Sequence, residues 1–343
     1  MRARSIHCVP VKNTTAQKPR IESIYVLKAL CSVMVVIVHA EMCGKVALIP
    51  LLGIATPCFL AITGFLMYSA NADRELGKAV KWARKCFGLS LLCNLLYLSF
   101  YLFDGVPLSK YSGGALIINL FTGHIISTHL WYLTAVWQGL LLMWLLRRYA
   151  PRLIAFAPLL YLLAWVLRSY GKVLFPELSS DTLFILRANA VVTALPFLAT
   201  GYLVHKYHTS ILAKVKILPC LLALLMLAYA EYALRLWSGS GRSIFFLCTW
   251  PLVATLMLTC CHYSNFTIPV LGRIGRLHSA NVYYFHILVL IYFNRLWPEQ
   301  TAWQALPVYI ATLPVSALFN LAHKGIGQLA ARIKACQSAR AGV

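Results

Sequence analysis

Two ionisable side chains stand in one strongly apolar stretch near the N-terminus. Lys28 and His39 lie within Tyr25–Glu41, where most other residues are apolar. Ionisable groups are expensive inside a bilayer, so each is a functional candidate. Eleven residues make about three helical turns, which puts both side chains on one helix face about 16 Å apart along the axis. His39 could equally be a buried hydrogen-bonding histidine, and Lys28 could extend its amine to the interface.

A cationic cluster follows the second apolar stretch. Lys81, Arg84 and Lys85 are expected in a loop that joins the second and third spans, with Lys81 and Arg84 on one face at i,i+3. Membrane topology alone would explain them. The sharper interpretation is a site for an anionic cytoplasmic ligand such as a nucleotide phosphate, because a guanidinium binds phosphate in a bidentate fork. No P-loop or GxGxxG motif accompanies the cluster.

Polar and aromatic residues also mark the later apolar stretches. The candidates for an acceptor or structural site are His129, Trp131 and Tyr132 at the outer start of the fourth span, Arg187 near the outer start of the sixth, and Tyr284 and His286 at the cytoplasmic start of the ninth. Trp131 and Tyr132 also suit an aromatic belt at the membrane surface. The eleven cysteines show no CxxC or Cys/His spacing, so no metal site is expected.

The composition of the chain predicts the class of fold in which these residues lie. The 343 residues are 60% hydrophobic and 12% charged, which excludes a soluble enzyme, a disordered chain and a secreted disulfide scaffold. An all-α, polytopic membrane bundle of about ten helices is predicted. The expected spans are 24–44, 46–70, 86–103, 129–146, 153–170, 183–204, 216–237, 243–262, 280–297 and 303–322, with a short non-spanning piece near 113–126.

The charge distribution predicts the orientation. The net charge is +22, and most of the basic residues fall on the side that holds both termini. The positive-inside rule explains this excess without a nucleic-acid partner and makes both termini cytoplasmic. Three segments are expected: a basic N-terminal tail over 1–23, a membrane domain over 24–322 and a basic C-terminal tail over 323–343 with no further domain after the last span.

An ordered set of short motifs resembles bacterial acyltransferase family 3 over residues 21–322. The motifs are Lys28-x10-His39, Phe59-Leu-Ala-Ile-Thr-Gly64-Phe-Leu, Lys81-x-x-Arg84, His129-Leu-Trp-Tyr-Leu133, Leu195-Pro-Phe-Leu-Ala-Thr-Gly201-Tyr and Ser279-Ala-Asn-Val-Tyr-Tyr-Phe-His286. Each is weak alone, whereas their shared order on ten spans is fairly specific.

The resemblance implies an O-acyltransferase, most simply an O-acetyltransferase, of the bacterial cytoplasmic (inner) membrane. Acetyl-CoA or another acyl-CoA would be the cytoplasmic co-substrate, with no bound cofactor. The acceptor would be a hydroxyl of a surface polysaccharide or its lipid-linked precursor. His39 matches the family's essential histidine and Lys28 its basic partner, while Lys81 and Arg84 match a two-arginine motif. The family often has an acidic residue where this chain has Val26.

The chemistry of the residues agrees with that expectation. Transfer from a thioester to a hydroxyl needs a base, and a neutral imidazole such as His39 suits physiological pH. Cations at the cytoplasmic end, among them Lys85, would hold the phosphates of CoA. Two other classes stay open: a secondary transporter with an intramembrane His/Lys path, and a passive glycan-export component. The expected partners are acyl-CoA, a glycan or lipid-linked glycan, and membrane lipids.

Overall fold

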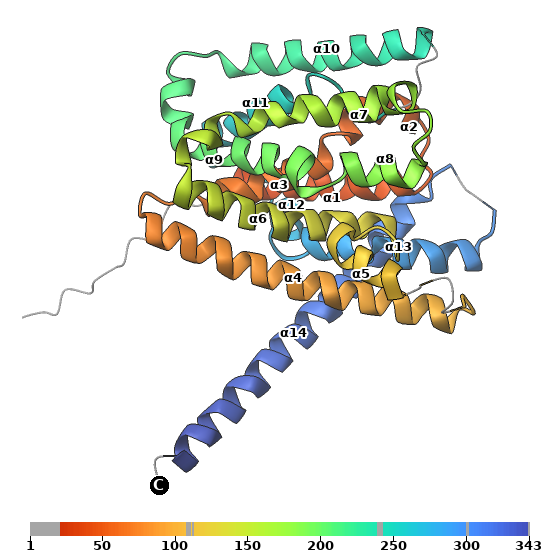
Figure 1. The fold of residues 1–343 in the computed structure, drawn as a ribbon, viewed down its shortest axis with the longest axis vertical. Coiled ribbons are helices and arrows are strands. Elements are labelled where there is room, and N and C mark those ends of the chain that lie inside the picture. The colour runs from red at the N-terminus through yellow and green to blue at the C-terminus, as the bar shows by residue number, and fades with distance from the viewer. Residues whose placement is uncertain (1–20, 108–110, 112, 239–242, 300–301, 342–343) are drawn as a thin grey trace, which may run out of the picture.

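Helices are the only regular secondary structure in the described part of the protein. In this computed structural model, residues 21–107, 111, 113–238, 243–299 and 302–341 are described, and they contain no β-strand. Most of the long helices lie side by side with roughly parallel axes, while the last helix extends away from the bundle (Figure 1). The all-α prediction is therefore confirmed.

The first half of the chain forms the centre of the bundle and one of its edges. Its helices are α1 (Glu22–His39), α2 (Lys45–Leu52), α3 (Ala55–Met67), α4 (Ala72–Phe103), α5 (Gly113–Thr122), the short 3-10 helix η2 (Thr128–Leu130) and α6 (Trp131–Tyr149). Only Gly53 and Ile54, which form a turn, separate α2 from α3, and Lys45–Met67 is long and apolar enough to be one span. The short α5 agrees with the expected non-spanning piece.

The second half begins with two short 3-10 helices and ends with a long helix. Its elements are η3 (Pro151–Ala155), η4 (Ala157–Leu159), α7 (Leu160–Leu174), α8 (Ser180–Arg187), a π-helical turn at Ala190–Ala194, α9 (Leu195–Leu212), α10 (Ile217–Trp237), α11 (Thr249–His262), α12 (Pro269–Leu277), α13 (Ser279–Leu296) and α14 (Ala305–Ala341). The α14 helix crosses the expected boundary at 322 without a break. Asn189 accepts hydrogen bonds from the amides of Val191 and Val192, which fixes the bend between α8 and α9.

Two glycines allow α3 and α9 to approach closely. A Cβ atom at Gly64 would lie 1.9 Å from the carbonyl oxygen of Leu198, and one at Gly201 would lie 1.7 Å from the carbonyl oxygen of Ala61. Small residues at such crossings are typical of membrane helices, where packing replaces the hydrophobic effect between helices. Both glycines belong to the motifs that carried the family resemblance.

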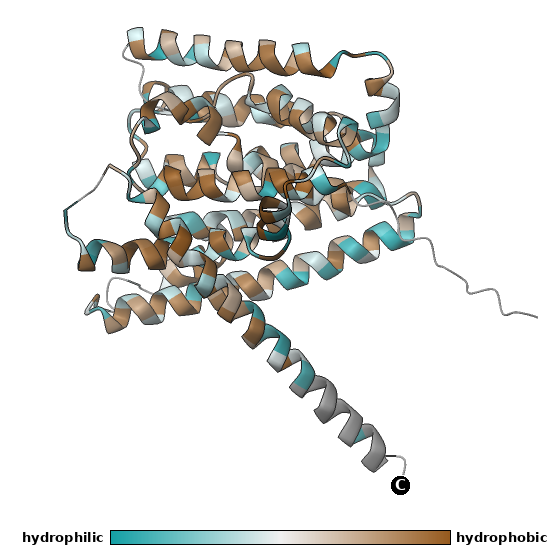
Figure 2. Ribbon diagram, turned by 180° about the vertical axis from the view of Figure 1, so that it is seen from behind, coloured by the Kyte–Doolittle hydropathy of each residue, from teal (hydrophilic) through white to brown (hydrophobic). Residues whose placement is uncertain are grey.

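Among the described residues, six segments are long and apolar enough to cross a membrane, or seven if the bent pair of α8 and α9 counts as one. Many large apolar side chains on α4 and α10 are exposed, among them Leu92, Leu95, Met226 and Leu227. Figure 2 shows extensive hydrophobic colouring on these outer helices. Exposed apolar faces of this size are expected where helices contact lipid rather than water.

The prediction that Lys81, Arg84 and Lys85 lie in a loop is wrong. The α4 helix begins at Ala72, so all three residues lie inside a 32-residue helix. Its N-terminus is stabilised by the Asn71 side chain, which accepts a hydrogen bond from the amide of Arg74 at 2.9 Å. Good helix formers then continue the helix through the charged segment, which the apolar pattern alone had placed outside the span.

Candidate functional site

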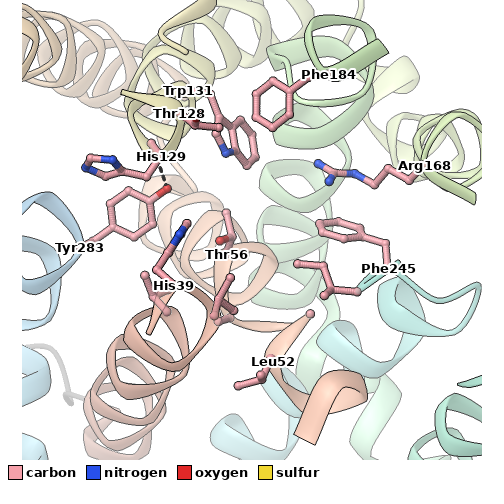
Figure 3. Close-up of a pocket in the computed structure, with 15 residues that line it drawn as sticks. His39, Leu52, Thr56, Thr128, His129, Trp131, Arg168, Phe184, Phe245 and Tyr283 are labelled. Atoms are coloured by element: carbon pink, nitrogen blue, oxygen red, sulfur yellow. Dashed lines mark hydrogen bonds between the residues drawn. The ribbon is translucent and has the colours of Figure 1, made fainter. Parts of the chain in front are cut away.

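A cavity of about 160 Å³ lies where α1 ends and where α3 and α6 begin. His39 enters it from α1, Thr56 from α3, and His129 and Trp131 from the start of the α6 segment (Figure 3). Tyr283 of α13 lines the same cavity. Elements far apart in the sequence therefore bring several polar and aromatic side chains to one small space.

His39 is the accessible histidine of this site. It is the last residue of α1, its side chain is exposed, and it lines the cavity. Within the described part of the chain, no hydrogen bond to its imidazole is found. The ring of His286 lies beside it, with the two ring centroids 5.2 Å apart. An imidazole that is held by its neighbours but has free nitrogens can exchange a proton with a bound molecule.

His286 is fully buried and has a defined tautomer. Its Nδ1 lies 3.0 Å from the carbonyl oxygen of Val282 and 2.9 Å from that of Tyr283. Because both neighbours are acceptors, Nδ1 must carry the proton, and the neutral ring then has an unprotonated Nε2. This Nε2 is buried and has no hydrogen-bond partner among the described residues.

His129 ties the cavity wall to α13. It is 3% exposed, and its ring centroid lies 5.4 Å from that of His286. Its Nδ1 lies 3.0 Å from the Oγ of Ser127. The hydroxyl of Tyr283 donates to the His129 carbonyl oxygen at 2.8 Å, and the hydroxyl of Tyr97 donates to the carbonyl oxygen of Tyr284 at 2.9 Å. These contacts fix the wall against which His39 stands.

The structure brings some of the predicted site residues together. His39, His129 and Trp131 line the cavity, His286 contacts both other histidines, and the Tyr132 ring packs on Tyr283 with centroids 4.6 Å apart. The sequence suggested that His286 lies at the start of its span, and the structure places it further along the helix. It lies about two turns inside α13, at the level of the last turn of α1.

Other predicted residues lie apart from the cavity lining. Lys28 is half-buried on α1, about 16 Å before His39 along the helix, and no described carboxylate pairs with it. Tyr284 contributes its carbonyl oxygen as an acceptor, whereas its side chain does not line the cavity. Arg187 does not line the cavity, and its carbonyl oxygen accepts a hydrogen bond from the Arg168 side chain. Lys81, Arg84 and Lys85 are exposed on α4.

A larger cavity of about 560 Å³ lies toward the opposite ends of α3 and α6. Its lining includes Arg147, Arg152 and Lys206, together with the rings of Tyr68 and Tyr202. Arg147 is also paired with Glu75, whose carboxylate oxygen lies 2.9 Å from the Arg147 Nε. This end of the bundle therefore offers a cationic, aromatic-walled space.

Sequence reasoning missed two features of the site. Arg168 and Phe245 line the smaller cavity, and the Arg168 guanidinium lies 3.8 Å above the Phe245 ring centroid. Arg168 stands in the apolar segment that became α7, so the rule that singled out Lys28 applied to it as well. Phe245 carries no such signal, because a phenylalanine in an expected span, here 243–262, is common. Within the described residues, no group of three or more His, Cys, Asp or Glu side chains could hold a metal ion.

The comparisons with known proteins identify the family. No curated protein and no solved structure matches the chain. A family described as "Acyltransferase domain", acyltransferase family 3, matches residues 21–321. The match spans the helices that build both cavities and every motif noted in the sequence. The chain therefore belongs to acyltransferase family 3 and is a multi-pass membrane protein of that family.

Proposed function

We propose that the protein is an O-acyltransferase, most simply an O-acetyltransferase, with His39 as its general base. It would transfer the acyl group of cytoplasmic acyl-CoA to a hydroxyl of a cell-surface polysaccharide or its lipid-linked precursor. The observation that carries the proposal is the accessible imidazole of His39 in the cavity, next to His129 and His286, which are both buried and hydrogen-bonded. Family membership favours this chemistry over the secondary transporter.

The proposed reaction uses His39 twice. A neutral imidazole nitrogen takes the proton of the acceptor hydroxyl while the oxygen attacks the thioester carbonyl carbon. The tetrahedral intermediate collapses, the C–S bond breaks, and the imidazolium returns its proton to the departing CoA sulfur. The products are an ester and free CoA thiol, and the histidine is regenerated. The hydroxyls of Thr56 and Thr128 line the same cavity and are candidates to stabilise the oxyanion.

The cationic cavity at the other end of the bundle suits the nucleotide part of the donor. Arg147, Arg152 and Lys206 supply positive charge, and guanidinium groups bind phosphate oxygens in bidentate fashion. The pantetheine arm would then run between the helices toward His39. Lys81, Arg84 and Lys85 are exposed on α4 and would attract the polyanionic donor to the membrane surface rather than enclose it.

The proposed topology has ten spans, with both termini in the cytoplasm. Seven segments already satisfy length and hydropathy when α8 and α9 count as one. The α7, α11 and α13 helices are shorter or carry more polar residues, and each packs against other helices of the bundle. With ten spans, the basic cavity faces the cytoplasm and His39 lies toward the outer side, as the positive-inside rule requires. The bacterial cytoplasmic membrane is the proposed location.

The test follows a labelled acetyl group from donor to product. Membranes that contain the protein are incubated with acetyl-CoA labelled in the acetyl group, and the carbohydrate fraction is examined for alkali-labile label. The proposal predicts ester-linked label with wild type and with His262→Ala, which removes an exposed histidine at the far end of α11. His39→Ala should give none. Equal labelling by His39→Ala removes this residue from the mechanism, and acetyl-CoA that is never consumed argues for another function.

A further inference from the structure

Arg168 is an intramembrane cation without a carboxylate partner among the described residues. It projects from α7 into the wall of the cavity that holds His39, as Figure 3 shows. One terminal nitrogen donates to the carbonyl oxygen of Arg187 at 3.3 Å. Its Nε is buried and has no hydrogen-bond partner in the described part of the chain. A charge in this position needs an anion or several acceptors to offset its desolvation.

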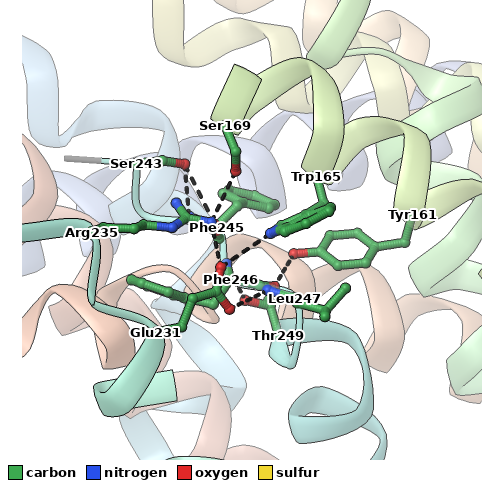
Figure 4. Close-up of polar contacts among 10 residues, drawn as sticks. All are labelled: Tyr161, Trp165, Ser169, Glu231, Arg235, Ser243, Phe245, Phe246, Leu247 and Thr249. Atoms are coloured by element: carbon green, nitrogen blue, oxygen red, sulfur yellow. Dashed lines mark hydrogen bonds and ion pairs between the residues drawn. The ribbon is translucent and has the colours of Figure 1, made fainter. Parts of the chain in front are cut away.

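Arg235 at the same end of the bundle shows what a structural arginine of this chain looks like. It forms an ion pair with Glu231 and donates to the Oγ of Ser169 at 2.9 Å (Figure 4). Glu231 also accepts from the indole of Trp165 at 3.1 Å and from the amide of Leu247 at 2.7 Å. The arginine and the carboxylate are thus satisfied by one another and by their neighbours, which Arg168 is not.

The Arg235 network also fixes the loop that carries Phe245. The amide of Leu247 is held by Glu231, and the Phe246 carbonyl oxygen accepts from the hydroxyl of Tyr161 at 2.7 Å. The Phe245 ring is consequently held beneath the Arg168 guanidinium. A guanidinium that stacks on a ring keeps its N–H groups in the plane, where they can bind an oxyanion from the side.

A second guanidinium adds to the positive potential. The Nε of Arg187 is also buried without a described partner, and its guanidinium carbon lies 5.9 Å from the Phe184 ring centroid. The rings of Phe184 and Trp131 line the cavity with Phe245. The cavity therefore combines aromatic walls, against which the C–H face of a sugar can pack, with the Arg168 guanidinium in its lining and Arg187 next to Arg168.

We propose that Arg168, supported by Arg187, binds a carboxylate or phosphate group of the molecule that is acylated at His39. The inference rests on the proposed function and narrows its acceptor to an anionic sugar, such as a uronic acid or a sugar phosphate. The two groups line one cavity, so an acceptor held at Arg168 presents a hydroxyl on the same ring to the imidazole. A neutral sugar has no anionic group for Arg168 to bind.

The test measures binding rather than turnover. Diethyl pyrocarbonate modifies accessible imidazoles, and His39 is exposed whereas His129 and His286 are buried, so the modification of His39 can be followed by peptide mass spectrometry. Glucuronate, glucose 1-phosphate and glucose are compared as protecting ligands on the full-length protein in detergent. We expect the anionic sugars to protect His39 at concentrations at least ten-fold below that of glucose.

Three variants assign the effect to Arg168. Arg168→Gln should abolish the advantage of the anionic sugars, and Arg168→Lys should keep part of it. Lys172→Gln is the matched control, because Lys172 lies one turn along α7, is exposed and does not line the cavity, and it should behave as wild type. Equal thermal unfolding midpoints of the variants establish that each is folded. Equal protection by glucose and by both anions in wild type, or an advantage unchanged in a folded Arg168→Gln, overturns the inference.

A further arm separates the two sources of the anion. An acyl group that itself carries a carboxylate could occupy the same cations, so succinyl-pantetheine is compared with acetyl-pantetheine. One result would assign the anion to the acyl donor instead of the acceptor. In it, succinyl-pantetheine protects His39, neither acetyl-pantetheine nor the anionic sugars do, and Arg168→Gln loses this protection. No outcome of the protection experiment depends on acyl transfer. If the labelled-acetyl experiment fails but protection of His39 still depends on Arg168, the proposed reaction is refuted and the anion site is supported.

Discussion

The rings of His39 on α1 and His286 on α13 lie with their centroids 5.2 Å apart, one accessible from the cavity and the other fully buried. The buried ring is fixed as the Nδ1–H tautomer by the carbonyl groups of Val282 and Tyr283. Because the His286 ring is neutral, it adds no positive charge beside a protonated His39. His286 is therefore a positioning residue for the proposed base.

Replacement of His286 should slow the reaction without abolishing it. His286→Phe keeps a buried ring but lacks the nitrogens. We expect kcat to fall about 10- to 100-fold, with little change in the KM for acyl-CoA, because loss of a positioning residue should cost less than the roughly 10²–10⁴-fold that the base itself contributes. His323→Phe on the exposed part of α14 is the control. An unchanged kcat, or a change confined to KM, would contradict the positioning role. Steady-state kinetics with the purified protein decides between them.

The hydroxyl of Tyr283 should contribute through the backbone of His129. Tyr283→Phe deletes the 2.8 Å hydrogen bond to the His129 carbonyl oxygen and leaves that buried acceptor unsatisfied, at a cost of about 1–3 kcal/mol. We expect a lower thermal unfolding midpoint and a smaller kcat. Tyr292→Phe, which alters an exposed tyrosine on the same helix, should change neither. Identical melting curves for Tyr283→Phe and wild type would count against the bond.

The close crossing of α3 and α9 should not tolerate a side-chain methyl group at Gly201. Gly201→Ala places a Cβ atom 1.7 Å from the carbonyl oxygen of Ala61, so the helices must move apart. Overpacking of this kind costs about 1–3 kcal/mol or more, and the yield of folded protein in detergent should fall. Gly77→Ala in α4 meets nothing within 4 Å and should be neutral or slightly stabilising. Size-exclusion profiles of the two variants provide the comparison.

The buried ion pair between Glu75 and Arg147 should be essential to folding. The Glu75 side chain is 1% exposed, and its second oxygen accepts from the amide of Ser69 at 3.1 Å. Glu75→Gln leaves the Arg147 charge without its carboxylate and should destabilise the protein by about 3–5 kcal/mol. Asp73→Asn, two residues earlier on the exposed side of α4, should have little effect. Thermal unfolding that is equal in the two variants would refute this role.

The orientation of the bundle can be tested with a native cysteine. Cys43 lies between α1 and α2, four residues after His39 in the sequence, and is exposed. If the termini are cytoplasmic, a membrane-impermeant maleimide should label Cys43 in intact cells, and Cys43→Ser should remove that label. G77C near the start of α4, in a Cys43→Ser background, should react only after permeabilisation. The reverse pattern would invert the proposed topology.

The sequence predicted the helical class and part of the site because both follow local rules. The spacing of Lys28 and His39 in an apolar segment marked α1 as a carrier of function. Short motifs placed His129 and His286 among the candidates. Their convergence could not be predicted, because the pairing of α1, α6 and α13 depends on helix packing that a linear pattern does not contain.

The errors have physical causes as well. Lys81, Arg84 and Lys85 were expected in a loop because charge interrupts the apolar pattern, yet charged residues are good helix formers and α4 continues through them. Arg168 was overlooked although its position in an apolar segment met the rule that identified Lys28. The role of Phe245 depends on a loop fixed by Glu231, which only the folded chain reveals.

The most direct test of the account is the rate of acetyl transfer by His39→Ala, measured with and without added imidazole. Purified wild type and variant are compared at equal concentration with labelled acetyl-CoA and the acceptor glycan. The account predicts that His39→Ala loses activity by about 100-fold or more, and that imidazole, which can enter the space left in the cavity, restores part of it. A wild-type rate for His39→Ala would show that another group takes the proton and would contradict the central claim.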